Sequence, residues 1–138
     1  MLPEYPASAS LLQFPTQWTT NGVFVDQKTL AVSADGAVRF ALVVRSPSGA
    51  ESVSFEGLRC VTGERRVFAY GRKAGDGGTW SVARNAEWRP ITDSGINRYY
   101  FELWRDVFCD GKRTEVRGEI LRNLRQGGRE RLQSMPSE

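Results

Sequence analysis

The clearest regularity in the chain is a two-residue alternation between positions 37 and 45. Every second residue there is large and apolar: Val38, Phe40, Leu42 and Val44. A period of two is typical of a β-strand with one buried face, so the alternation predicts a strand over 37–45. Asp35-Gly36, directly before it, suits the positive φ angles of a tight hairpin turn.

Shorter apolar segments on either side of this strand are separated by turn residues. Together the predicted strands cover 23–25, 29–33, 37–45, 51–61, 66–70 and 79–82. Turns as short as Pro47-Ser48-Gly49 join antiparallel neighbours, because parallel neighbours need long crossovers. We therefore expect an antiparallel meander of five or six strands. Gly57 indicates a β-bulge in the fourth of them.

After position 95 the apolar spacing changes to three and four residues, which predicts helices. The first apolar stripe consists of Ile96, Tyr99, Tyr100, Leu103, Trp104, Val107 and Phe108. A second helix is expected over about 114–126, ended by Gly127-Gly128. Its apolar face would be Val116, Ile120, Leu121 and Leu124. The predicted fold class is α+β, with the two C-terminal helices packed on one face of the sheet.

The length of 138 residues suits a single domain with one core. Prolines at positions 3, 6 and 15 favour an extended N-terminal arm over residues 1–20. The α+β domain is expected over 21–128, followed by a polar tail over 129–138. No apolar run in the chain approaches the roughly 20 residues that cross a membrane.

The chain has two cysteines, Cys60 in a predicted strand and Cys109 at the end of the first predicted helix. A bond between them would tie the sheet to the helices, and closing a loop of roughly 50 residues would contribute about 4 kcal/mol. The alternative is a pair of separate buried thiols. A zinc site would have to recruit carboxylates, because the chain contains no histidine.

The absence of histidine also excludes Ser-His-Asp and Cys-His mechanisms. The glycine-rich stretch 71–78 lacks the spacing of a phosphate-binding loop and is interpreted as a hairpin connection. We predict no catalytic, cofactor-binding or metal-binding residues. The alternative from another class is a histidine-free enzyme, in which Glu56 would face Glu102 or Asp106 as a pair of carboxylates.

A bulge at Gly57 would bring Glu56 and Arg59 to one side of their strand. One interpretation is a structural ion pair. The other is a groove for an anionic or aromatic ligand, since guanidinium and indole groups suit such recognition. The candidate groove residues are Glu56, Arg59, Tyr70, Arg72, Trp80, Arg84 and Trp88.

The formal net charge is only +3, but residues 112–131 contain seven basic and three acidic side chains. This segment raises a third hypothesis, a nucleic-acid binder. Because Glu119 is placed to pair with Arg122 three residues later, we interpret the segment as a solvated helix face and expect no nucleic-acid partner.

Several short elements resemble the cryptic-neisserial-protein-like family of small bacterial cell-envelope proteins, whose function is unassigned. They are Leu2-Pro3 with Tyr5-Pro6, Leu12 with Phe14, Asp35-Gly36 with Val38-Arg39, Glu56-Gly57-Leu58-Arg59-Cys60, Ala69-Tyr70-Gly71, Trp80, Trp88 with Ile91, and Phe108-Cys109.

The resemblance implies export, hence a periplasmic or outer-membrane-anchored precursor with an oxidised cysteine pair, and it implies no activity. Members of the family begin with an export signal, so we interpret Met1-Leu2-Pro3 as a trimmed start. The expected function is a non-catalytic envelope module that binds an envelope protein or a small anionic ligand, without a cofactor.

Overall fold

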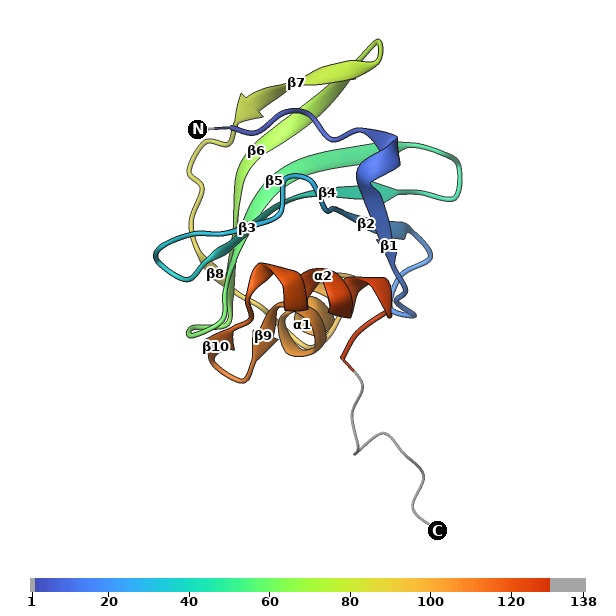
Figure 1. Ribbon diagram of the computed structural model, residues 1–138. Helices are drawn as coiled ribbons and strands as arrows, with labels where there is room; N and C mark the ends of the chain where they lie inside the picture. The colour runs from blue at the N-terminus through green and yellow to red at the C-terminus, as the bar shows by residue number, and fades with distance from the viewer. Residues whose placement is uncertain (1, 130–138) are drawn as a thin grey trace.

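The computed structural model describes residues 2–129 and has an antiparallel sheet as its framework (Figure 1). Six strands follow one another across this sheet in the order β1-β2-β4-β5-β6-β7, while β3 pairs with β4 and β8 pairs with β6. The bounds are β1 Leu11–Phe14, β2 Gly22–Asp26, β3 Ala31–Val32, β4 Val38–Arg45, β5 Glu51–Arg59, β6 Glu64–Ala74, β7 Gly77–Val82 and β8 Arg89–Pro90. The predicted α+β fold with an antiparallel meander is confirmed.

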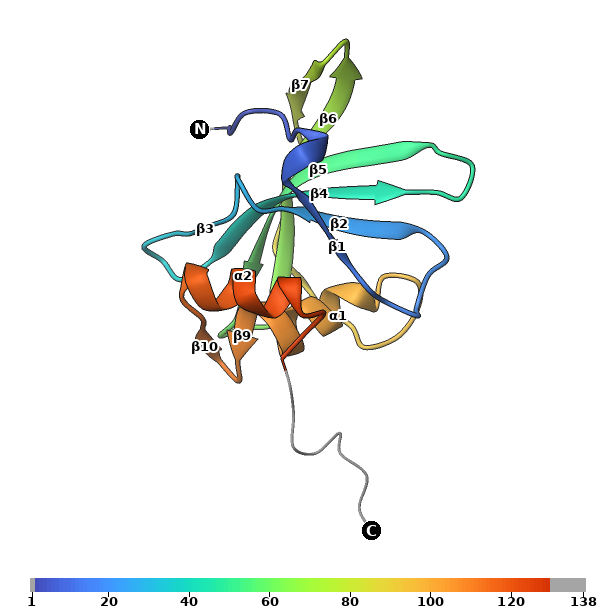
Figure 2. The same ribbon diagram turned by 45° about the vertical axis from the view of Figure 1, so that its right-hand side comes forward.

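Both predicted helices lie on the same face of the sheet, as Figures 1 and 2 show from two directions. In chain order this layer comprises α1 Tyr99–Leu103, a π-helical turn η2 Trp104–Phe108, a small hairpin of β9 Cys109–Asp110 and β10 Arg113–Thr114, and α2 Arg117–Arg125. Gly127 and Gly128 have positive φ angles and end α2, as predicted. Within residues 2–129, no helix is both long enough and apolar enough to span a membrane.

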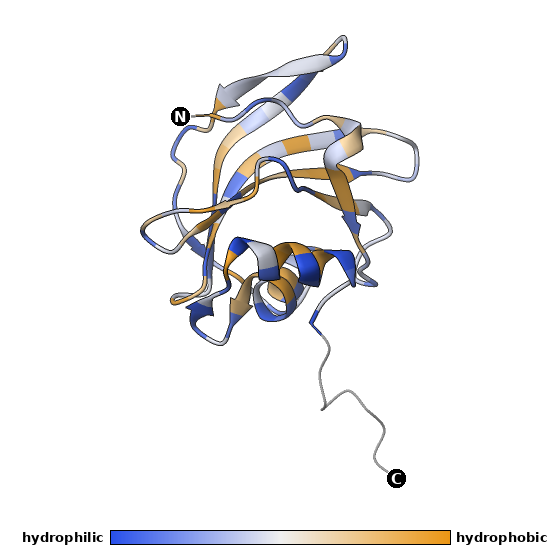
Figure 3. Cartoon of the chain, viewed as in Figure 1, coloured by the Kyte–Doolittle hydropathy of each residue, from blue (hydrophilic) through white to orange (hydrophobic). Residues whose placement is uncertain are grey.

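The main core lies between the sheet and these helices. The alternation predicted in β4 directs Val38, Phe40 and Leu42 into it, where each is at most 2% exposed. The ring centroids of Phe40 and Phe108 are 5.0 Å apart, so β4 packs directly on the helical layer. In Figure 3 the strands carry much of the hydrophobic colour, and hydrophilic and hydrophobic bands alternate along α2. The alternation in sequence therefore determines which face of the sheet the helices cover.

The opposite face of the sheet carries a row of aromatic side chains. Along this row Trp88, Phe68, Phe55, Trp80 and Tyr5 follow one another with centroid distances of 6.1, 5.9, 6.2 and 5.4 Å. The N-terminal arm crosses this face, on the side away from the helices (Figures 1 and 2). The indole nitrogen of Trp80 donates a hydrogen bond to the carbonyl of Pro3, which anchors the arm.

Part of the N-terminal segment joins the sheet. A short 3-10 turn, Ser8–Ser10, leads into β1, which pairs with β2, and Phe14 at the end of β1 is 2% exposed in the core. At the other end of the chain, Arg129 donates hydrogen bonds to the carbonyls of Arg105 and Cys109. The rest of the expected polar tail, residues 130–138, lies outside the described residues.

Three local predictions were wrong. The bulge lies in β6, where Phe68 is the extra residue opposite the Phe55/Glu56 step, and Gly57 is paired regularly with Arg66. Gly57 instead makes room for aromatic rings, because a Cβ there would lie 2.7 Å from the Phe68 ring. Ile96 and Val116 were placed on apolar helix faces but are 74% and 66% exposed, because α1 and α2 begin only after them.

Candidate functional site

A buried carboxylate lies at the centre of the polar contacts between sheet and helices. Glu56 in β5 is 2% exposed, and its Oε2 accepts hydrogen bonds from Ser54 Oγ at 2.6 Å and from Tyr100 Oη at 2.8 Å. Its Oε1 lies 3.5 Å from Nη1 of Arg65. Burial raises the pKa of the Glu56 carboxyl, while these donors and the Arg65 charge act in the opposite direction. Glu56 is therefore a structural anchor that positions Arg65.

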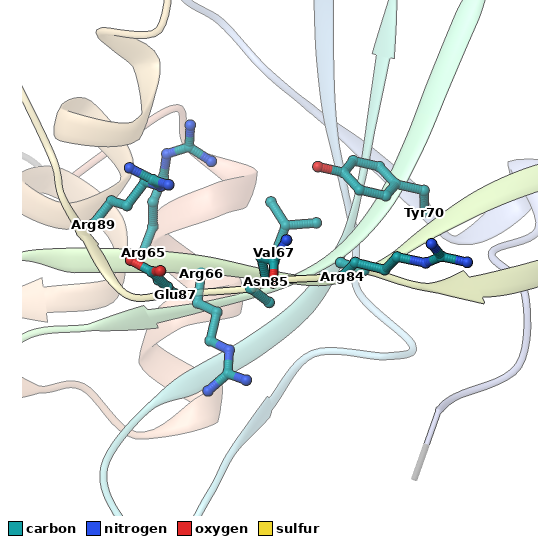
Figure 4. A pocket seen from close by; sticks show the side chains of 10 residues that line it. Arg65, Arg66, Val67, Tyr70, Arg84, Asn85, Glu87 and Arg89 are labelled. Carbon is teal, nitrogen blue, oxygen red and sulfur yellow. The ribbon is translucent and has the colours of Figure 1, made fainter.

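Arg65 faces two environments. Its guanidinium lies 4.0 Å from the ring centroid of Tyr100 and pairs with Glu56, and the same side chain lines a surface pocket. Across the β6–β8 pair, Arg65 is the register partner of Arg89. Both arginines point to the same side, toward the helices, whereas Arg66 points to the opposite side (Figure 4). Two like charges directly opposite in a sheet repel, so this pair favours an anion between them.

This pocket, which we call the arginine pocket, lies between β6 and the segment that returns from β7 to β8. Its volume is about 350 Å³. Four arginines and one glutamate are among its lining residues, which are Arg65, Arg66, Val67, Tyr70, Ala83, Arg84, Asn85, Ala86, Glu87 and Arg89. Among residues 2–129, Arg84 and Arg89 have no ion-pair or hydrogen-bond partner for their side chains. The pocket therefore offers unneutralised guanidinium donors for an anion.

The structure separates the seven candidate groove residues predicted from sequence. Tyr70 and Arg84 line the arginine pocket. Arg72 lines a different hollow beside Tyr5. Glu56 is buried under the helices. The remaining three, Arg59, Trp80 and Trp88, belong to the opposite face of the sheet, where Arg59 lies 3.8 Å over the Trp88 ring and pairs with Glu64 at 3.5 Å.

The pocket residues that sequence reasoning missed are chiefly Arg65, Arg66 and Arg89. Residues 59–89 contain six arginines, and this local density was the available signal. The pairing of Arg65 with Arg89 depends on β8, a two-residue strand that has no periodicity to detect. Asn85, which has a φ of +54°, forms the turn that directs the chain back to β8.

Cys60 and Cys109 form a disulfide, and both are 1% exposed. Cys60 follows β5 and Cys109 begins β9, so the bond joins the sheet to the helical layer. The indole nitrogen of Trp104 donates a hydrogen bond of 3.2 Å to the carbonyl of Cys60 beside it. The disulfide thus holds together the turn that follows Cys60 and the hairpin that begins at Cys109, with Trp104 beside them.

The carboxylates suggested for catalysis have separate partners. Glu102 accepts a hydrogen bond of 2.6 Å from Thr16, and Asp106 pairs with Arg105, whereas Glu56 contacts Arg65. Among residues 2–129, no group of three or more histidine, cysteine, aspartate or glutamate side chains is placed to hold a metal ion. The contacts of Glu56 therefore favour a role in positioning the Arg65 guanidinium over a role in acid–base catalysis.

The arginines of the basic segment make contacts within the protein. Arg117 donates hydrogen bonds to the carbonyls of Leu30 and Gln27, both at 2.8 Å. Arg129 pairs with Glu115 at 2.7 Å, and Arg122 lies 3.6 Å from Glu119 as its spacing predicted. Arg117 and Arg129 thus hold α2 and the chain after it against the rest of the domain, whereas the Arg122–Glu119 pair lies within α2. Arg131 lies outside the described residues.

Fold and site together define a small α+β protein with an antiparallel sheet, a helical layer attached by a disulfide, and an arginine pocket at a sheet edge. A family model described as the CNP1-like family matches residues 1–125, and the chain belongs to this family. The resemblance inferred from sequence is therefore confirmed.

The chain is also similar to Cryptic neisserial protein 1 of Neisseria gonorrhoeae (strain ATCC 700825 / FA 1090), with 27% identity over 119 residues. The aligned part covers 78% of this chain, and the chain spans 58% of the length of that relative. No solved structure matches the chain.

Proposed function

We propose that this protein is a non-catalytic binding module of the bacterial cell envelope that holds a small anionic ligand in the arginine pocket. The observation that carries the proposal is the arrangement of Arg65 and Arg89, which face each other across β6 and β8. Arg65 pairs with buried Glu56 at 3.5 Å, whereas the Arg89 side chain has no ion-pair or hydrogen-bond partner among residues 2–129. A phosphate or carboxylate group between them would accept charge-assisted hydrogen bonds from both.

The disulfide supports the envelope location. Structural disulfides persist in oxidising compartments such as the periplasm and are rare in the cytosol. The location is tested by counting alkylatable thiols in protein isolated under denaturing conditions from its native host. We expect none before reduction and two after it. Two free thiols before reduction would contradict the envelope location.

Ligand binding is tested by calorimetric titration with inorganic phosphate. We expect Arg89→Gln to weaken phosphate binding about tenfold, because it removes a charged hydrogen-bond donor. The matched control is Arg72→Gln, which removes the same charge from an exposed arginine of β6 outside the pocket. It should change the affinity less than about twofold.

Equal losses in the two variants would show that phosphate responds only to net charge. Absence of phosphate binding to the unmodified protein would contradict the anion site. Either outcome leaves the test of location unaffected.

A further inference from the structure

An apolar groove lies beside the arginine pocket. Its volume is about 410 Å³, within the range of ligand-binding sites in proteins. Most of its lining side chains are apolar or aromatic, and the full lining is Val61, Thr62, Gly63, Pro90, Ile91, Phe101, Trp104, Gly111 and Lys112. Val61 at its rim is 68% exposed, so its apolar surface is available to a ligand.

The disulfide fixes the two turns that form walls of this groove. Val61, Thr62 and Gly63 directly follow Cys60, and Gly111 and Lys112 follow Cys109 by two and three residues. Trp104, between these turns, is fixed by its hydrogen bond to the Cys60 carbonyl. The groove is therefore preformed, and little ordering would be needed on binding.

The linings of the groove and of the arginine pocket come close to each other in two places. In β8, Arg89 lines the pocket and the next residue, Pro90, lines the groove. Arg65 of the pocket, in β6, lies over the ring of Tyr100 in α1, and Phe101, the residue after Tyr100, lines the groove. The groove lining thus begins one residue along β8 from Arg89 and one residue along α1 from Tyr100, the residue whose ring Arg65 contacts.

We propose that the ligand is an anionic amphiphile, whose phosphate or carboxylate head lies between Arg65 and Arg89 and whose alkyl chain lies in the groove. This inference rests on the proposed function and adds the ligand class. Charge complementarity selects the occupant, because the guanidinium groups at one end of the groove attract the anionic head and the aliphatic and aromatic walls favour the alkyl chain. Lys112, which also lines the groove, likewise favours a negatively charged ligand.

The first test is a chain-length series of monoalkyl phosphates, each used below its critical micelle concentration, with inorganic phosphate as the reference. Each fully buried methylene contributes about a fourfold gain in affinity. We expect octyl phosphate to bind at least about tenfold more tightly than inorganic phosphate, and decyl phosphate more tightly again. A neutral octyl glycoside should bind more weakly than octyl phosphate, because it leaves the arginines without an anion.

The second test uses two substitutions of exposed valines, so that folding is preserved. Val61→Asn removes apolar surface from the rim. We expect it to weaken the binding of octyl phosphate about threefold and to leave the binding of inorganic phosphate unchanged. The control Val116→Asn makes the same change at a similarly exposed valine that precedes α2, and it should affect neither ligand. Arg89→Gln should weaken both ligands.

An affinity that does not depend on chain length, or a Val61→Asn variant that binds octyl phosphate normally, would overturn the amphiphile while leaving the anion site intact. If alkyl phosphates bind but Arg89→Gln has no effect on them and inorganic phosphate does not bind, both the anion site and this inference are wrong.

Discussion

The two faces of the sheet are covered by different means. The helix-facing side packs aliphatic and phenyl side chains under α1, η2 and α2, and the disulfide joins the two layers. The opposite side carries an aromatic row covered by the N-terminal arm and by Trp88 from the segment before β8. The disulfide attaches the helices to the sheet, whereas ring contacts and a hydrogen bond hold the arm and Trp88 on the opposite side. We infer that the helix-covered side contributes more to stability and that the arm side tolerates change better.

The largest expected effect separates the two faces directly. Phe40→Ala should lower the free energy of unfolding by about 3 to 5 kcal/mol, because Phe40 is fully buried and closely packed surroundings relax only partly around a cavity. Phe55→Ala, at a 6% exposed position of the aromatic row, should cost at least about 1 kcal/mol less, because the arm can relax. Urea denaturation of both variants measures the difference. Equal losses would contradict the inferred asymmetry.

The disulfide gives the next largest effect. Replacing both Cys60 and Cys109 by serine should reduce stability by about 2 to 4 kcal/mol, because the unfolded chain regains the freedom of the closed loop. The measurement is thermal and urea unfolding beside the oxidised protein, with the reduced protein as control. A double variant as stable as the oxidised protein would show that packing alone holds the helices on the sheet.

The attachment of the arm can be tested through the glycines beneath Tyr5. Tyr5→Ala should cost about 1 to 2 kcal/mol through loss of the Trp80 contact. A Cβ at Gly71 would lie 2.7 Å from the Tyr5 ring, so Gly71→Ala should displace the arm. The two effects should therefore be less than additive when combined, which a double-mutant cycle measures. Full additivity would mean that Gly71 and Tyr5 act independently.

The smallest expected effect is a change in pH dependence. Burial raises the pKa of the Glu56 carboxyl, so the folded state holds this proton more tightly than the unfolded chain does. The contribution of Glu56 to stability is therefore fully present below its ordinary pKa and is lost as pH rises through the raised, folded-state pKa.

Glu56→Gln cannot titrate. Above the ordinary glutamate pKa of about 4.3, its stability relative to the unmodified protein should therefore increase with pH until the folded-state carboxyl has ionised. Urea denaturation at a series of pH values measures this trend, with exposed Glu87→Gln as the control. A constant difference across the range would show that Glu56 does not link protonation to folding.

Local patterns were sufficient to predict the strands from β2 to β7 and the end of α2. The alternation of β4 and the glycines after α2 have direct physical consequences for neighbouring residues, so they could be recognised without the fold. The first residues of α1 and α2 were harder to predict, because Ile96 and Val116 fit the apolar spacing but lie before the helices. Periodicity does not report where a turn ends.

The sequence by itself determined the architecture, because the longer strands and both helices carry an apolar period, and it excluded histidine-dependent chemistry by composition. Only the tertiary structure decided the site. The register of β8 against β6 places Arg89 opposite Arg65, and the regular β5 strand buries Glu56 while Arg59 lies on the other face. Such juxtapositions depend on strand pairings between residues distant in sequence, and a shift of one residue in register would reverse which side chains share a face.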